Sequence, residues 1–235
     1  MGIGTTVNGG FAEYCAVPAS QVYPFPAALS YEKAAMTEPL ACCLHGIDMC
    51  DISCGDTVAI IGGGMIGLLM LQLAKLRGAA TLILVEPMAE KRALGAKLGA
   101  DILIDPITED AAAVLQERGI HRVSTVIECV GKPATMEQAI ALAGKKATVM
   151  LFGLSAPQET ITIQPFELFK KELTLRASYI NPYTQKRAID LIAAGKVDVS
   201  SMVCAVEALE ELPAILADGK RRAQGKILIA PGAAL

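Results

Sequence analysis

The sequence predicts an α/β protein built on a doubly wound parallel sheet. From residue 57 to residue 152, short β-branched runs alternate with helical segments that end at glycines, which is typical of parallel strands joined by crossover helices. Inside this region, an apolar run leads directly into three consecutive glycines and then into a helix. Residues 1–41 and 181–235 do not follow the alternation. We expect them to form a second domain together, with the domain of residues 42–180 inserted between them.

The three glycines belong to a longer motif. The strand Thr57–Ile61 is followed by Gly-Gly-Gly-Met-Ile-Gly at positions 62–67. Gly62 allows a tight turn, Gly64 lets a pyrophosphate approach the backbone, and Gly67 lets the helix pack closely on the strand. The helix begins with free N–H groups and a positive dipole end, so the motif predicts a dinucleotide site.

An acidic residue follows at the distance that such a site requires. Glu86 lies 19 residues after Gly67, at the end of the second strand, where a carboxylate accepts hydrogen bonds from a ribose diol. A carboxylate would also repel a 2′-phosphate, so NAD is favoured over NADP. Lys91 and Arg92 lie nearby and leave NADP open as the alternative.

The uncharged run at positions 57–74 has a second interpretation. It contains 18 residues, which is about the length of a membrane-spanning helix. The adjacent glycines and the Val-Ala-Ile-Ile run before them favour a buried parallel strand and a turn instead.

The remaining elements are expected from periodicity, caps and glycine stops. A strand is expected at 11–18, a helix opening after Ser30 as N-cap, and a second helix at 40–49 after an interruption at Glu38-Pro39. The central region predicts helices at 67–77, 88–98, 109–118 (with Thr108 as N-cap) and 134–143, and strands at 81–85, 102–104, 124–129 and 147–152. The last part predicts strands at 160–163, 173–177, 202–206 and 226–230, and helices at 165–171, 182–194 and 208–217.

Composition narrows the class of protein. The 235 residues are 53% hydrophobic, enough for one large or two modest domains, and the net charge is −3. No basic block indicates binding to nucleic acid or to an anionic membrane surface. The N-terminus has neither the basic nor the apolar region of a secretory signal, so a cytoplasmic location is expected.

The seven cysteines are odd in number and irregular in spacing, which does not indicate a disulfide framework. The segment Cys42-Cys43-Leu44-His45, with Cys50 and Cys54 beyond it, is a candidate metal site. It lacks a C-x₂-C pair, and Cys42, Cys43 and His45 cannot all face one way on a helix. Buried thiols are therefore favoured over a self-contained zinc site.

Several short motifs together resemble the medium-chain, zinc-dependent dehydrogenases, the group that includes sorbitol, threonine and alcohol dehydrogenases. The motifs occur in the family order and span nearly the whole chain. They are Gly-Gly-Phe-Ala-Glu-Tyr at 9–14, Glu-Pro-Leu-Ala at 38–41, Gly-Asp-Thr-Val at 55–58, the glycine turn, Lys-Leu-Gly-Ala-Asp at 97–101, Glu-Cys-Val-Gly at 128–131 and Gly-Lys-Ile at 225–227.

This resemblance implies a Rossmann domain that binds NAD at 42–180. Residues 1–41 would be a remnant of a mostly β, GroES-like catalytic domain with a connecting helix, and 181–235 would return to that domain. In the family, the main ligands of the catalytic zinc and the cysteines of the structural zinc precede the 9–14 motif. We therefore expect an N-terminally truncated chain with little activity alone, in which zinc is doubtful.

The resemblance also implies which positions contact the cofactor. The chain has residues that match the family's pyrophosphate turn, its ribose-binding acid, a basic residue near the adenosine ribose, and the loops that face the nicotinamide half. The matched residues are Gly62, Gly64, Met65, Ile66, Gly67, Glu86, Lys91, Cys129, Val130, Phe152, Gly153, Leu154, Tyr179 and Asn181.

Glu38 is the one chemical residue that the resemblance retains. It matches a glutamate that lies beside the catalytic zinc, holds its water and in some relatives reaches the metal. It would supply at most one ligand, where a catalytic zinc takes three from protein. The alternative for Glu38 is a helix-end carboxylate beside Pro39. His45 matches the family too, but a packed histidine is favoured in its apolar helical run.

The implied reaction is hydride transfer from a secondary alcohol to NAD, with a small-molecule alcohol or polyol as substrate. The alternative is a non-catalytic module for NAD binding or oligomerisation. The strand at 173–177 is expected at the sheet edge, and the resemblance implies a homodimer through it. No nucleic-acid or membrane partner is expected.

Overall fold

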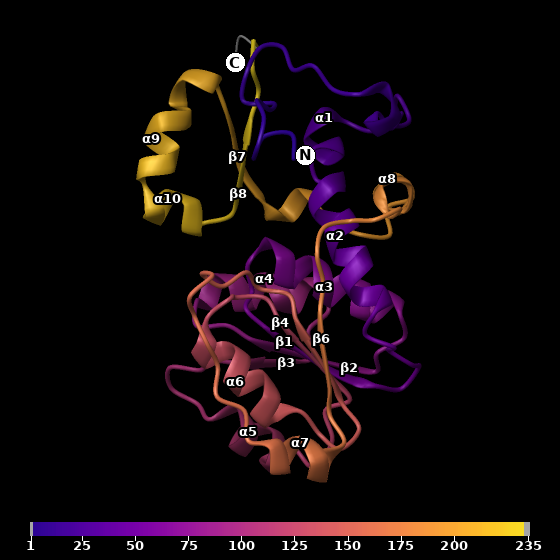
Figure 1. Cartoon of the computed structure of the whole chain (residues 1–235), viewed down its shortest axis with the longest axis vertical. Coiled ribbons are helices and arrows are strands. Elements are labelled where there is room, and N and C mark those ends of the chain that lie inside the picture. Colours follow the sequence, from indigo (N-terminus) through magenta and orange to yellow (C-terminus); the bar gives the residue numbers. More distant parts are fainter. Residues whose placement is uncertain (1, 233–235) are drawn as a thin grey trace. The chain divides into compact units, whose positions relative to one another are not determined.

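The computed structural model describes residues 2–232, which form two compact units (Figure 1). One unit comprises residues 38–188. The other comprises residues up to 37 together with those from 189 onward.

The larger unit is a parallel α/β sheet with its crossover helices. Its elements are α2 (Thr37–Asp48), β1 (Thr57–Ile61), α3 (Met65–Leu76), β2 (Thr81–Val85), α4 (Ala89–Leu98), β3 (Ile102–Ile104), α5 (Ala111–Glu117), β4 (Thr125–Glu128), α6 (Pro133–Leu142), β5 (Thr148–Leu151), α7 (Pro165–Lys171) and β6 (Thr174–Ala177). Helix α8 (Gln185–Ala193) crosses into the second unit.

The described strands of this unit form one sheet in the order β3-β2-β1-β4-β5-β6, with every pair parallel. The predicted fold class is confirmed. The chain proceeds outward from β1 to β3 on one side, then returns to β4 beside β1 and proceeds outward to β6. The point between β1 and β4 is therefore the topological switch, where ligands bind beyond the carboxyl ends of the strands. β6 lies at the sheet edge, as expected.

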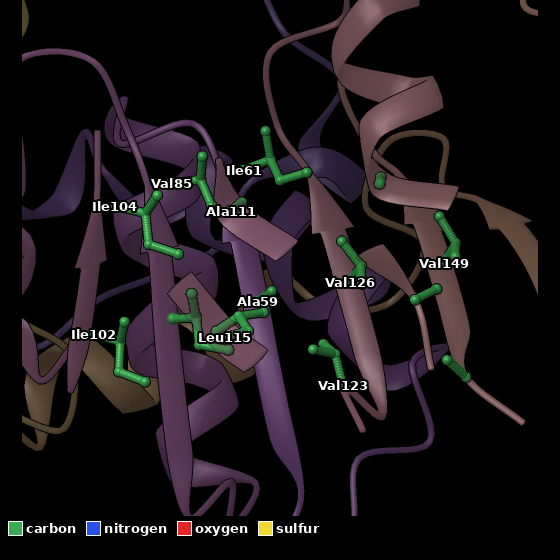
Figure 2. Close-up of a cluster of buried hydrophobic side chains, with 14 residues drawn as sticks. Ala59, Ile61, Val85, Ile102, Ile104, Ala111, Leu115, Val123, Val126 and Val149 are labelled. Atoms are coloured by element: carbon green, nitrogen blue, oxygen red, sulfur yellow. The ribbon is translucent and has the colours of Figure 1, made fainter. Parts of the chain in front are cut away.

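The side chains of alternate residues in each strand point to opposite faces of the sheet. On one face, Ala59, Val85 and Val126 join a buried cluster with Ala111 and Leu115 of α5 (Figure 2). Figure 1 shows α5 and α6 on this face and α3 and α4 on the opposite one. Both faces are covered, which explains why the strands are nearly continuous apolar runs.

The second unit contains η1 (Ala19–Gln21), α1 (Tyr31–Ala34), η2 (Ser200–Met202), β7 (Val203–Glu207), η3 (Leu209–Glu211), α9 (Leu212–Ala217), α10 (Gly219–Ala223) and β8 (Lys226–Ile229). β7 and β8 pair in parallel with each other. Ser30 caps α1 as predicted, since its hydroxyl accepts a hydrogen bond from Lys33 N.

Two predicted strands are wrong. Residues 11–18 are extended and bent but belong to no strand in the described chain, and Phe11 and Tyr14 are exposed. Their alternating pattern suits a strand, but a strand exists only where another backbone pairs with it. Residues 160–163 likewise enter no ladder, and Thr162 N donates instead to Glu137 Oε1.

Several predicted helix boundaries are also wrong. α2 begins at Thr37, so Glu38 and Pro39 lie in its first turn, where the N–H that proline lacks is not needed. α5 begins at Ala111 with Asp110 as its cap, whose Oδ1 accepts from Ala113 N. α8 begins at Gln185, three residues later than expected, and the segment at 208–217 divides into η3 and α9.

The described helices offer no membrane span. None of them is both long enough and apolar enough to cross a bilayer. The uncharged run at 57–74 is divided into β1, a glycine turn and α3, so its length does not correspond to one helix.

Candidate cofactor site

The glycine turn connects β1 to α3 at the switch point. Gly62 has a φ of +100°, in the left-handed region that favours glycine, and its N–H donates to Val85 O at 2.8 Å. A Cβ on Gly67 would overlap Gly62 O, so α3 packs against the turn as closely as the backbones allow. A Cβ on Gly64 would meet no atom within 4 Å. The turn is therefore closed on the side of the helix and open at Gly64.

Helix α3 begins directly at this opening. Gly64 is its N-cap residue and has no side chain to occupy the first N–H groups. Twelve residues of α3 point their aligned peptide dipoles at the turn, so its N-terminus is a suitable site for an anion. The backbone thus fits a pyrophosphate at Gly64, Met65 and Ile66.

Glu86 lies against the same turn from the end of β2. The residue is only 5% exposed, and both carboxylate oxygens accept backbone hydrogen bonds. Oε2 accepts from Gly63 N at 2.6 Å, and Oε1 accepts from Met88 N at 2.8 Å. Each oxygen keeps a second lone pair for a ribose hydroxyl. The acid expected from sequence is therefore held within the turn.

Two basic residues of α4 follow this acid. Arg92 Nη1 donates to Glu86 O and to Pro87 O, both at 2.7 Å, and Arg92 Nη2 pairs with Asp105 Oδ2 at 3.1 Å. These bonds fix the β2–α4 loop and occupy the guanidinium. Lys91 is half-buried on the same helix.

The end of β4 lies on the other side of the turn. Cys129 N donates to Ile61 O at 2.9 Å, and a Cβ on Gly62 would lie 2.8 Å from Val130 Cγ2. Burial raises the pKa of the Cys129 thiol well above its ordinary value, and the charge of Glu128 acts in the same direction. Cys129 therefore stays a neutral thiol.

The ends of β5 and β6 border a cavity of about 360 Å³. Phe152, Gly153 and Leu154 line it together with Ser178, and Leu154 is almost fully exposed. The Phe152 ring also packs on α2, since a Cβ on Gly46 would lie 2.8 Å from it. Phe152 thus has a packing role in addition to the expected one.

The two remaining predicted residues follow β6. Tyr179 is exposed. Asn181 is half-buried, and its carbonyl accepts a hydrogen bond from Thr184 N. Thr184 Oγ1 donates to Ala41 O at 2.7 Å, which ties this loop to α2.

The donors near Glu38 do not fit a zinc ion. Glu38 is exposed, and its Oε1 accepts a hydrogen bond from Cys42 Sγ at 3.2 Å. Burial, together with the hydrogen bond and the charge of Glu38, raises the pKa of the Cys42 thiol to about 12. Within residues 2–232, no three His, Cys, Asp or Glu side chains are grouped so as to hold a metal.

The expectation of buried thiols is met only in part. Cys43 and Cys50 are buried and Cys42 is half-buried. Cys54, however, lies exposed in the turn that precedes β1.

Sequence reasoning missed two residues at this edge. Glu128 and Ser178 each carry a buried side-chain oxygen with no hydrogen-bond partner among the described residues. Glu128 entered only as part of a motif. An acid that ends an otherwise apolar strand was the available signal, whereas nothing in the sequence distinguishes Ser178.

The parallel sheet and the glycine turn at its switch point define the Rossmann class of α/β proteins. Within that class, the chain belongs to the zinc-binding dehydrogenase family, whose model matches residues 65–194. The expected family is confirmed.

Several curated relatives carry polyol names, and others are named for L-threonine or butanediol. The chain is 31% identical over 232 residues to D-arabinitol dehydrogenase 1 of Uromyces fabae, covering 97% of this chain and 66% of the relative. It is 34% identical over 206 residues to D-arabitol-phosphate dehydrogenase of Enterococcus avium, covering 86% of this chain and 58% of the relative. The chain thus spans about three fifths to two thirds of the length of these relatives.

Solved structures give the same result. A candidate zinc-binding dehydrogenase of Sinorhizobium meliloti 1021, bound to NADP, is 39% identical with a TM-score of 0.94, covering 97% of this chain and 68% of that chain. Galactitol-1-phosphate dehydrogenase of Escherichia coli is 28% identical with a TM-score of 0.86, covering 97% of this chain and 69% of that chain.

Proposed function

We propose that the chain is the NAD-binding part of an oxidoreductase that acts on alcohols or polyols. The domain that would bind NAD is residues 42–180. The observation that carries this proposal is the arrangement of Glu86, whose buried carboxylate accepts a hydrogen bond from Gly63 N beside an open glycine turn. This arrangement offers an acceptor for a ribose diol next to free N–H groups for a pyrophosphate.

NAD, when bound, accepts a hydride from the carbinol carbon of a secondary alcohol. The contribution of this chain is binding and orientation. The N-terminus of α3 would hold the pyrophosphate, Glu86 the adenosine ribose, and the ends of β4, β5 and β6 the other half of the cofactor. The substrate class, polyols and their phosphates, is proposed from the names of the relatives.

The chain is proposed to prefer NAD to NADP. A 2′-phosphate at the adenosine ribose would face the Glu86 carboxylate, and Arg92 is already bonded to two carbonyls and to Asp105. Lys91 is the remaining nearby cation. Because the Sinorhizobium relative is bound to NADP, both cofactors must be titrated. Tighter binding of NADPH than of NADH would overturn the preference.

A substitution at Gly64 tests the binding site without disturbing the fold. Gly64 has φ −70° and ψ 178°, which alanine adopts, and a Cβ there meets no protein atom. Gly64→Ala should lose no more than about 1 kcal/mol of stability, since alanine is a poorer N-cap than glycine. It should bind NADH about 10- to 100-fold more weakly, because the methyl group occupies the approach of the pyrophosphate. Fluorescence titration with NADH measures this.

The matched control is Gly219→Ala, a glycine-to-alanine change in the second unit whose Cβ would lie 3.9 Å from its nearest neighbour, Arg222. It should leave NADH affinity unchanged. Equal affinity of wild type and Gly64→Ala, or no binding of NADH by the wild type, would reject the proposed site.

Turnover by this chain alone is proposed to be absent or very low. Glu38 is the one zinc-side residue that the family pattern places here, and a catalytic zinc takes three protein ligands. Zinc content and alcohol-dependent NADH formation test this directly. Stoichiometric zinc together with turnover would contradict the proposal.

The second candidate function is a non-catalytic module that binds NAD or assembles copies of the chain. The position of β6 favours it, since this strand pairs with β5 alone within the described sheet. Thr174 N donates to Ala147 O of the β5 side, so the N–H groups of the alternate residues Leu175 and Ala177 face outward. Ala177→Pro should dissociate a dimer that forms through this edge, as light scattering would show.

A further inference from the structure

Glu128 is an acid in a position where packing alone would favour an apolar residue. It ends β4, is 0% exposed, and follows three buried strand residues. Burying a carboxyl group costs free energy unless its oxygens find donors. Its Oε2 has no hydrogen-bond partner among the described residues. A buried polar atom of this kind calls for an explanation other than stability.

The other oxygen of the same carboxyl group organises the loop between β4 and α6. Oε1 accepts hydrogen bonds from Val130 N at 2.7 Å, from Gly131 N at 2.9 Å and from Thr135 Oγ1 at 2.8 Å. Two of these donors belong to the loop and the third to the first turn of α6. A single atom therefore sets the path of residues 129–135.

Glu128 also fixes the end of β5. Its main-chain oxygen accepts from Phe152 N at 3.0 Å and from Gly153 N at 2.9 Å. A Cβ on Gly153 would lie 2.6 Å from Glu128 Oε2, so the unpartnered oxygen is packed directly against this glycine. The same residue thus sets the spacing between the loops that follow β4 and β5.

These loops lie where the second half of a dinucleotide would extend. The register places Glu128 beside Ile61 of β1 on one side and Leu151 of β5 on the other. If the pyrophosphate lies at the glycine turn and the adenosine ribose at Glu86 on β2, the other half crosses the switch point toward β4 and β5.

We infer that Glu128 is a positioning residue for the nicotinamide half of the cofactor, acting through the 129–135 and 152–153 loops without touching the cofactor. This inference rests on the proposed binding of NAD. It predicts that loss of the Glu128 carboxyl group weakens binding of the nicotinamide half of the cofactor. Binding of the adenosine half should stay unchanged, since Glu86 and the glycine turn are held by their own hydrogen bonds.

The test compares NADH with ADP-ribose, which lacks the nicotinamide, by calorimetric titration of three variants. Glu128→Leu fills a similar volume but accepts no hydrogen bond, and should weaken NADH about 10-fold while ADP-ribose changes less than about twofold. Glu128→Gln retains an acceptor at Oε1 and should recover most of the NADH affinity. Thr135→Val removes one of the three donors to Glu128 Oε1. It should lower the ratio of NADH affinity to ADP-ribose affinity about twofold to threefold.

Each outcome either supports or rejects the positioning role of Glu128. Equal weakening of NADH and ADP-ribose by Glu128→Leu, or unchanged affinity for both, overturns the positioning role. If Glu128→Leu does not fold, the variant Thr135→Val at a half-buried position decides, and an unchanged ratio of NADH to ADP-ribose affinity there rejects the inference. If the unmodified chain binds neither ligand, the proposed function itself fails, and that result is seen before any variant is made.

Discussion

Two buried acids lie on opposite sides of the glycine turn, Glu86 directly after β2 and Glu128 at the end of β4, and their side chains form different hydrogen bonds. Each carboxylate oxygen of Glu86 accepts one hydrogen bond, Oε2 from Gly63 N in the turn and Oε1 from Met88 N in the following loop. Glu128 concentrates three donors on Oε1 and leaves Oε2 without a partner among the described residues. In the sheet register Glu128 is level with Val85, one residue before Glu86, so the two acids lie near the same edge of the sheet but bond to different parts of the chain.

The difference follows the two halves of the sheet. On the β2 side, the Glu86 side chain bonds to Gly63 of the glycine turn, which precedes α3. On the β4 side, the Glu128 side chain accepts hydrogen bonds from residues that follow it closely, and its main-chain oxygen accepts from Phe152 N and Gly153 N after β5. The first acid therefore holds the glycine turn, whereas the second holds the loop after its own strand against the end of the neighbouring strand.

Gly67→Ala should produce the largest effect, because it breaks the turn that both halves share. The new Cβ would overlap Gly62 O, and α3 would have to move away from the backbone. We expect a loss of about 1–3 kcal/mol in the free energy of unfolding and a loss of NADH binding of at least about 100-fold. Denaturant unfolding and fluorescence titration measure the two effects, with Gly64→Ala as the variant that should lose binding with a smaller loss of stability. Full stability of Gly67→Ala would show that the turn yields more easily than its geometry indicates.

Gly153→Ala should disturb only the part of the candidate site on the β4 side, where the nicotinamide half of the cofactor would bind. Its Cβ would contact Gly131 N and lie 2.6 Å from Glu128 Oε2, forcing the two loops apart. NADH should bind about 10-fold more weakly, with a much smaller change for ADP-ribose, as calorimetry would detect. An equal loss for both ligands would mean that the two halves are not independent.

Glu86→Ser should affect the β2 side. It removes the acceptor of Gly63 N and the carboxylate that opposes a 2′-phosphate. We expect NADH to bind about 10-fold more weakly and NADPH to lose little, so the discrimination between them relaxes. Glu86→Gln, which keeps one acceptor, is the control and should lie between the two. Unchanged discrimination in Glu86→Ser would remove Glu86 from cofactor selection.

The smallest effect concerns the reactivity of the cysteine thiols, of which Cys129 directly follows Glu128. Alkylation requires the thiolate, and burial raises the pKa of Cys129, Cys43, Cys42 and Cys50. At about pH 8 these four should stay neutral and react slowly with iodoacetamide, and their labelling should rise as the pH approaches their raised pKa values. The exposed residues Cys15, Cys54 and Cys204 should be modified first, as peptide mass spectrometry would show. Rapid labelling of Cys129 would indicate that the loop after β4 opens.

Much of the sheet could be predicted from local pattern. The bounds of β1, β2, β3 and α7 agree with the predicted ranges to the residue. β1, β2 and β3 are short apolar runs that end at Gly62, Glu86 and Asp105, and α7 begins at Pro165, so their neighbours in sequence decide their conformation. The strand expected at 11–18 failed for the opposite reason, since strand formation there depends on a partner that the sequence does not identify.

The sequence by itself determined the fold class, the family and the first half of the site. The glycine turn and Glu86 lie within one βαβ unit, where spacing along the chain translates directly into position in space. Only the tertiary structure decided the second half. Val130, Gly131 and Thr135 follow Glu128 closely in sequence, but their hydrogen bonds to its Oε1, and the contact of Gly153 with its Oε2, depend on a side-chain direction and a backbone path that no motif specifies. Glu128 acquires its role because folding places those segments around one buried carboxyl group.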